Sequence, residues 1–85
     1  MDQRDLTRIR AFVAELLQEH DDHDEFNDSE SLIKAGRLDS LAVVKLVTFL
    51  ESDFGVDFGR IEFDPQRFDT VAEIAAVIEE SRSTG

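Results

Sequence analysis

Cysteine is absent from the 85-residue chain. The chain therefore has no disulfide framework, no thiolate nucleophile of its own and no cysteine-based zinc site. It also has no apolar run near the ~18–20 residues of a membrane span, and its first residues, MDQRDLTRIRAF, contain no hydrophobic signal region. These absences exclude several classes of protein and lead us to expect a cytoplasmic one.

Basic residues are scarce, with nine lysines and arginines against 20 aspartates and glutamates and a formal net charge of −11. Such a chain repels nucleic acid phosphates and anionic lipid headgroups, so we expect neither nucleic acid binding nor membrane insertion. It suits a protein that is steered to basic patches on other proteins, although acidity on its own also serves solubility. The sequence has no glycine-rich phosphate loop, and nothing pairs two carboxylates in an apolar pocket for catalysis.

The length favours one domain, residues 1–85, because a chain this size has no room for a second core. Apolar residues recur at three- and four-residue steps in three segments, which we expect to be helices. They run from about residue 5 to 19, from 39 to 54, and from 70 to about 80, with a frayed tail after that. No strand pattern of any length is present.

Capping residues mark where these helices begin and end. Asp39 is a good N-cap, and Gly55 stands where a helix C-terminal glycine belongs. Asp64-Pro65 is typical of the start of a short turn, and Thr70 with Glu73 forms a capping box. We therefore predict an all-α fold, a small four-helix bundle with a short third helix and a long loop between helices 1 and 2.

That long loop, residues 20 to 39, is mostly polar and acidic. Long connections in compact domains are often functional. Gly36 can take the positive φ of a sharp turn, and we expect three apolar side chains to tie the loop to the core: Phe26, Leu32 and Ile33. The segment from His20 to Glu25 also resembles a cation site, but it lacks the central glycine of a calcium loop. A solvated acidic loop is the favoured interpretation, with no metal site.

Two further apolar residues, Leu41 and Val44, lie beside the core stripe of the second helix. They make the stripe wider than a small bundle requires, so they are either additional core or a surface for a partner. Periodicity favours core. The six phenylalanines from Phe12 onward that are not in the loop are also interpreted as core: Phe12, Phe49, Phe54, Phe58, Phe63 and Phe68.

Ser40 stands at the start of the second helix, directly after Asp39 and the acidic loop. The triplet Asp39-Ser40-Leu41 alone is ordinary capping chemistry. In this position, however, the serine hydroxyl would lie at the surface beside unpaired backbone N–H groups and the positive end of the helix dipole. Such a place accommodates a phosphate diester well.

The hexapeptide Gly36-Arg37-Leu38-Asp39-Ser40-Leu41 resembles the signature of carrier proteins. The order of a helix, a long acidic loop, D-S-L, "LVTFLESDFGVDF", a short third helix and a capped fourth resembles the acyl carrier family over nearly the whole chain. The resemblance implies that Ser40 carries 4′-phosphopantetheine through a phosphodiester. It implies that Asp39 caps the helix and helps a phosphopantetheinyl transferase, which uses coenzyme A and magnesium, with Leu41 in a supporting role.

The same resemblance implies the partners of the chain. Leu41 and Val44 would form part of the surface that partner enzymes read, with Glu51 contributing charge and Lys45 at the rim. The partners would be the transferase, an acyl- or aminoacyl-activating enzyme and downstream transferases. The chain itself would catalyse nothing. As a monomer, it would hold a cargo as a thioester and so raise its effective concentration at successive enzymes.

Two departures bear on the pathway. Fatty acid carriers have acidic residues along the exposed side of the second helix, where this chain has Ala42 and Lys45. The segment from Gly59 to Thr70, with EFDPQRFDT, is more like those of D-alanyl carriers and discrete carriers of polyketide or peptide assembly. We therefore expect a discrete acyl or aminoacyl carrier of a dedicated pathway. The alternatives are an unmodified acidic helical interaction or regulatory domain and, third, a cation-binding helical protein.

Overall fold

The structure is a computed structural model that describes residues 2–59 and 64–84. In these ranges the chain forms three α-helices, α1 (Gln3–Glu19), α2 (Ser40–Phe54) and α3 (Val71–Thr84), and no strand. The predicted all-α class is confirmed. The four-helix bundle is not, because the expected short third helix is the 3₁₀ helix η1 (Pro65–Phe68), four residues long. Short 3₁₀ turns are common connectors between longer helices.

The capping residues expected from the sequence are present. Oδ1 of Asp39 accepts the Ala42 N–H at 2.9 Å, and Gly55 ends α2 in the left-handed conformation with φ of 66°. Oγ1 of Thr70 accepts the Glu73 N–H at 3.0 Å. The expected fraying after residue 80 is wrong, because α3 continues to Thr84. Arg82 stabilises this last part by pairing with Asp5 of α1 at 3.1 Å.

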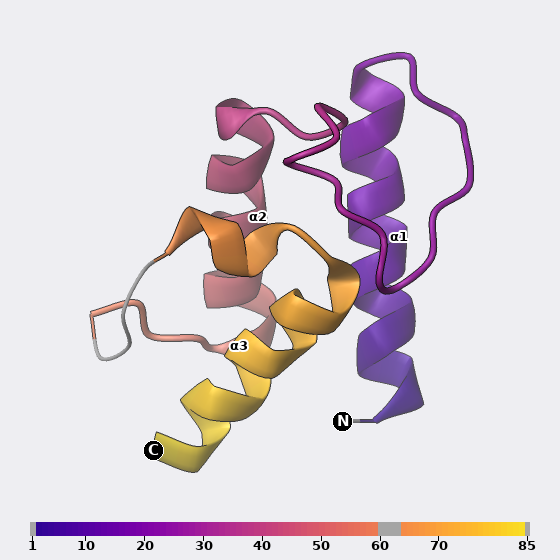
Figure 1. Cartoon of the computed structure of the whole chain (residues 1–85). Coiled ribbons are helices and arrows are strands. Elements are labelled where there is room, and N and C mark those ends of the chain that lie inside the picture. Colours follow the sequence, from indigo (N-terminus) through magenta and orange to yellow (C-terminus); the bar gives the residue numbers. More distant parts are fainter. Residues whose placement is uncertain (1, 60–63, 85) are drawn as a thin grey trace.

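The helices α1 and α2 lie side by side and run in opposite directions, while α3 crosses in front of them (Figure 1). Phe12 of α1 stacks on Phe49 of α2 with ring centroids 4.2 Å apart. Two ion pairs join the same helices, Arg8 with Asp53 at 2.7 Å and Lys45 with Glu19 at 2.8 Å. Within the described residues, no helix has both the length and the apolar character needed to cross a membrane.

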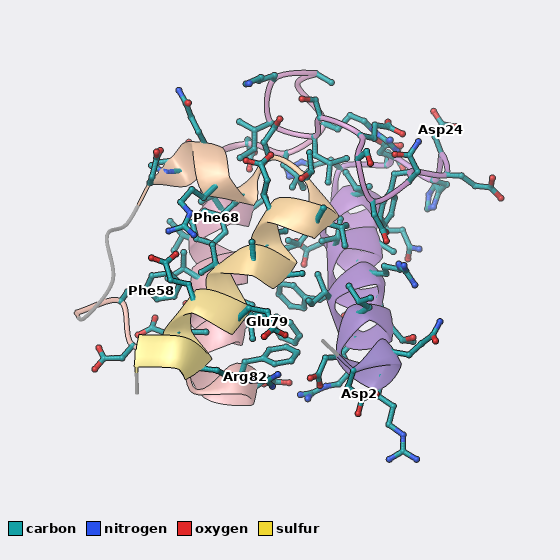
Figure 2. All side chains as sticks on the ribbon, turned by 60° about the horizontal axis from the view of Figure 1, so that its bottom comes forward. Asp2, Asp24, Phe58, Phe68, Glu79 and Arg82 are labelled. Atoms are coloured by element: carbon teal, nitrogen blue, oxygen red, sulfur yellow. The ribbon has the colours of Figure 1, made fainter. Side chains whose placement is uncertain are left out.

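The core is formed by the apolar stripes of the three α-helices, with contributions from the loop and η1. Leu32 is wholly buried, and Phe26 and Ile33 pack against the core, so these expected anchors are confirmed. Phe68 is buried and its ring lies 6.0 Å from that of Phe58 (Figure 2). The expected core residue Phe63 lies outside the described residues. The buried apolar residues are Ile9, Val13, Leu16, Leu17, Leu32, Leu38, Ala42, Val43, Leu46, Leu50, Val56, Phe68, Val71, Ile74, Val77 and Ile78.

Two expectations about α2 are wrong. Leu41 and Val44 are not core, because they are 59% and 60% exposed. Ala42, which the comparison with fatty acid carriers places on the exposed side, is buried. The reason is geometric: Leu41 and Val44 stand one turn apart on a helix face next to the one that carries Ala42, Val43 and Leu46. The other elements cover only the latter face.

Candidate functional site

Ser40 is the first residue of α2 and its side chain is exposed. Its hydroxyl makes no side-chain hydrogen bond to any other residue that the structure describes. The positive end of the helix dipole lies at this position, which favours a negatively charged group. The hydroxyl is therefore accessible to a modifying enzyme, as the sequence predicts, and removing it should not disturb the fold.

Asp39 uses its two carboxylate oxygens differently. Oδ1 caps α2 by accepting the Ala42 N–H, and Oδ2 lies 3.4 Å from Nε2 of His20 at the end of α1. The hydrogen bond from Ala42 lowers the pKa of Asp39 against the opposing effect of desolvation, and the nearby His20 lowers it further. The carboxylate beside Ser40 is therefore ionised at neutral pH.

Ser40 is one of the residues that line an apolar groove with a volume of about 610 Å³. The apolar lining comes from Ile33 and Leu38 of the loop, Val43 and Val44 of α2, and Pro65 of η1. An exposed serine at a helix N-terminus fits a phosphodiester, and the apolar groove offers a surface for the chain that such a diester carries. The residues present thus fit an attached 4′-phosphopantetheine group.

Arg37 holds the acidic loop that leads to this site. Its guanidinium donates to both carboxylate oxygens of Asp22, at 2.8 and 3.0 Å, and to Glu30 at 2.6 Å. It also donates to the backbone carbonyls of Asp24 and Glu25. The hydrogen bond with Asp22 raises the pKa of Arg37 and lowers that of Asp22. Two acidic side chains and two carbonyls of the loop are therefore held by one arginine of the same chain.

We expect Arg37→Lys to weaken the hydrogen bonding that holds the loop, because one ammonium group cannot replace a planar guanidinium group with five N–H donors. We expect the amide protons of residues 22 to 30 to exchange with solvent faster, with the exchange of α1 and α3 unchanged. Hydrogen–deuterium exchange measures this directly. The matched control is Arg8→Lys, because Arg8 pairs with Asp53 on the surface. Equal exchange in the two variants would contradict the role of Arg37.

Asp69 fixes the second half of the loop. Its buried carboxylate accepts the N–H groups of Ile33 and Lys34, at 2.9 and 3.0 Å, and the hydroxyl of Ser31. Its carbonyl oxygen accepts the Leu32 N–H at 2.7 Å. Burial raises the pKa of Asp69, but the hydrogen bonds from Ser31, Lys34 and Ile33 outweigh it and the net shift is downward.

The residues of the predicted partner surface are exposed, but one of them is paired within the chain. Leu41, Val44 and Glu51 are exposed on α2. Lys45 is exposed too, but its ammonium is bound to Glu19 of α1 at 2.8 Å. The charge of Lys45 is therefore paired within the chain. This weakens the expected role of Lys45 as a lone positive charge at the rim of the partner surface.

Three residues of the site were not singled out for these roles by sequence reasoning: His20, Arg37 and Asp69. Arg37 stands within the hexapeptide motif, and Asp69 directly precedes the Thr70 cap. His20 was considered only as a metal ligand. In the described ranges, no group of three or more histidine, aspartate or glutamate side chains is arranged to hold a metal ion.

Comparisons with known proteins point to one family. A family model described as a phosphopantetheine attachment site matches residues 7–78. A D-alanyl carrier protein of Lacticaseibacillus rhamnosus is 40% identical over 52 residues, and one of Lacticaseibacillus casei (strain BL23) is 38% identical over 52 residues. Each alignment covers 61% of this chain and 64% of the relative. No solved structure matches the chain.

The match to the family model covers most of the chain and includes Ser40, Asp39 and the three buried helix faces around them. The expected cofactor and the expected absence of catalysis follow from membership, because the family is a phosphopantetheine attachment site and its carrier proteins are non-catalytic. On this match, together with the exposed serine at the start of α2, the chain belongs to the phosphopantetheine attachment family of non-catalytic carrier proteins.

Proposed function

We propose that the chain is a discrete carrier protein that bears 4′-phosphopantetheine on Ser40. The observation that carries this proposal is the exposed Ser40 hydroxyl at the N-terminus of α2, beside the ionised Asp39. The attached group supplies the thiol that this cysteine-free chain lacks, and a cargo is held on it as a thioester. The chain holds the group at the surface and leaves the chemistry to its partners.

The cargo is proposed to be an acyl or aminoacyl group of a dedicated pathway, with an activating enzyme and downstream transferases as partners. D-alanine is the first cargo to test, because two similar proteins are D-alanyl carrier proteins. The match covers 64% of each of these relatives. The arrangement as one monomeric domain and the cytoplasmic location stay predictions from the sequence.

The test uses a broad-specificity phosphopantetheinyl transferase with coenzyme A and magnesium. Intact-protein mass spectrometry should show one added phosphopantetheine group per chain. The product is then offered to a D-alanine-activating enzyme with ATP, and in parallel to a fatty acid malonyl transferase. A gain of D-alanine with little malonyl transfer supports the dedicated pathway. A chain that gains no phosphopantetheine supports the rival function, an unmodified acidic interaction domain.

Substitutions in the proposed partner surface are expected to slow phosphopantetheine transfer without loss of stability. Because Leu41 and Val44 are exposed, Leu41→Ser and Val44→Ser should change the free energy of unfolding by less than about 0.5 kcal/mol. If partners bury these side chains, kcat/KM for phosphopantetheine transfer should fall roughly five- to ten-fold. Transfer kinetics with thermal melting measure both quantities.

The matched control for this surface is Ser52→Ala, in the same helix. Ser52 is exposed, and its hydroxyl donates to Thr48 and Asp53 within α2. Its substitution should leave transfer unchanged. If Leu41→Ser and Val44→Ser also behave like the wild type, these residues do not form the surface that the transferase reads.

A further inference from the structure

The two end residues of the loop between α1 and α2, His20 and Asp39, are in contact, and we call this pair the neck of the loop. His20 is the C-cap of α1, and Asp39 is the N-cap of α2. Their side chains approach to 3.4 Å, between Nε2 of His20 and Oδ2 of Asp39. Ser40 follows Asp39 directly, so the neck of the loop and the serine are adjacent.

The two contacts of Asp39 differ in what they fix. The Ala42 N–H holds Oδ1 within α2 itself, which sets the local cap. His20 at the end of α1 contacts Oδ2, and so adds to the Lys45–Glu19 ion pair that joins the same end of α2 to α1. Neighbouring cations are engaged elsewhere, Arg37 with Asp22 and Glu30 and Lys45 with Glu19. Among the described residues, the basic side chain in contact with Asp39 is therefore His20.

We propose that His20 is a positioning residue for the modification of Ser40. It acts through Asp39: by holding this carboxylate and the neck of the loop, it presents the serine to the transferase in one geometry. The inference rests on the proposed function of Ser40. It concerns presentation of the carrier and leaves the reacting atoms to the enzyme.

The modification transfers the phosphopantetheine group of coenzyme A to Ser40. The Ser40 hydroxyl gives up its proton, and its oxygen forms a bond to the phosphorus of coenzyme A that bears the pantetheine. The bond from that phosphorus to the adenosine bisphosphate half breaks, and this half leaves with the electron pair. Because His20 contacts Asp39 and not Ser40, its loss should change how well the enzyme binds the carrier more than how fast the bound carrier reacts.

The experiment measures initial rates of transfer at increasing concentrations of carrier for the wild type, His20→Ala and His20→Gln. Because both side chains of this contact are partly exposed, its contribution is small, and we expect KM for His20→Ala to rise roughly two- to five-fold, with kcat unchanged. His20→Gln should recover part of the loss, because the glutamine side chain carries N–H donors that can contact the same carboxylate. The matched control is His23→Ala, because exposed His23 lies 3.8 Å from a different aspartate, Asp21.

A double-mutant cycle decides whether His20 acts through Asp39. In an Asp39→Ala background, the further change His20→Ala should leave KM unaltered. An equal loss in both backgrounds would overturn the proposal, as would wild-type kinetics for His20→Ala, an equal effect of His23→Ala, or a loss of helical circular dichroism in the His20 variants. A wild type that gains no phosphopantetheine at all would instead refute the proposed function.

Discussion

Ser40→Ala is expected to abolish the addition of phosphopantetheine completely. Mass spectrometry after treatment with transferase and coenzyme A should show one added group on the wild type and none on the variant. The physical reason is that the hydroxyl oxygen forms the new bond to phosphorus, and alanine has no atom that can replace it. Partial modification of Ser40→Ala would contradict the assignment.

The same variant should remain folded, because Ser40 is exposed and the cap of α2 belongs to Asp39. We expect its melting temperature to match the wild type closely. Controls come from three other serines: Ser29→Ala, Ser31→Ala and Ser52→Ala should each be modified as fully as the wild type. A group found on any of these serines would move the attachment site away from α2.

Asp69→Ala is expected to have the largest effect on stability. The substitution leaves two backbone N–H groups and the Ser31 hydroxyl without their acceptor at a position that is 3% exposed. Unsatisfied buried donors of this kind should cost about 2–4 kcal/mol in total. For a domain of this size that corresponds to a fall in melting temperature on the order of 10–20 °C. Thermal or urea unfolding followed by circular dichroism measures it.

Two variants sharpen this test. Asp69→Asn keeps an oxygen for the Ile33 and Lys34 amides, and the Ser31 hydroxyl can accept from the new amide. It should therefore lose clearly less stability than Asp69→Ala. Asp64→Ala removes the exposed carboxylate that caps η1 and should cost only about 0.5–1 kcal/mol. If Asp69→Ala is as mild as Asp64→Ala, Asp69 does not anchor the loop.

Asp69 also predicts a dependence of stability on pH. Its pKa is lower in the folded chain than its ordinary value of about 3.9. Its contribution is therefore fully present above pH ~4 and is lost as the pH falls through the folded-state pKa. In Asp69→Asn this contribution to the acid-induced loss of stability should be missing, and melting temperatures between pH 3 and 7 would show the difference.

The interactions that the sequence predicts correctly are the local ones. The Asp39 cap, the glycine at the end of α2 and the Thr70 cap each involve residues within one helical turn of one another. A short spacing of suitable residues is enough to specify such contacts, wherever the helix lies. The place of Ser40 on the first turn of α2 follows from the Asp39 cap, which is why the motif could be interpreted without tertiary information.

Which face of α2 is covered was decided by the other helices. Periodicity places Leu41 and Val44 beside the core stripe of α2, but it carries no information on which neighbours will pack there. In the structure Ala42 is buried and the two larger residues are exposed. An apolar stripe wider than the contact area must leave part of itself in solvent, and the sequence alone does not say which part.

The partners of Arg37, Asp69 and His20 were also decided only by the tertiary structure. With 20 acidic residues in the chain, many could pair with Arg37, and the hydrogen bonds of Asp69 reach back to residues 31 to 34. His20 meets Asp39 only because α1 and α2 run in opposite directions and bring the two ends of the loop together. By itself, the sequence determined the three α-helical segments, the caps at Asp39 and Thr70 and the place of Ser40 at the start of α2. The packing of the helices determined how the loop is held around Ser40, because ion pairs between distant residues depend on where the folded chain places them.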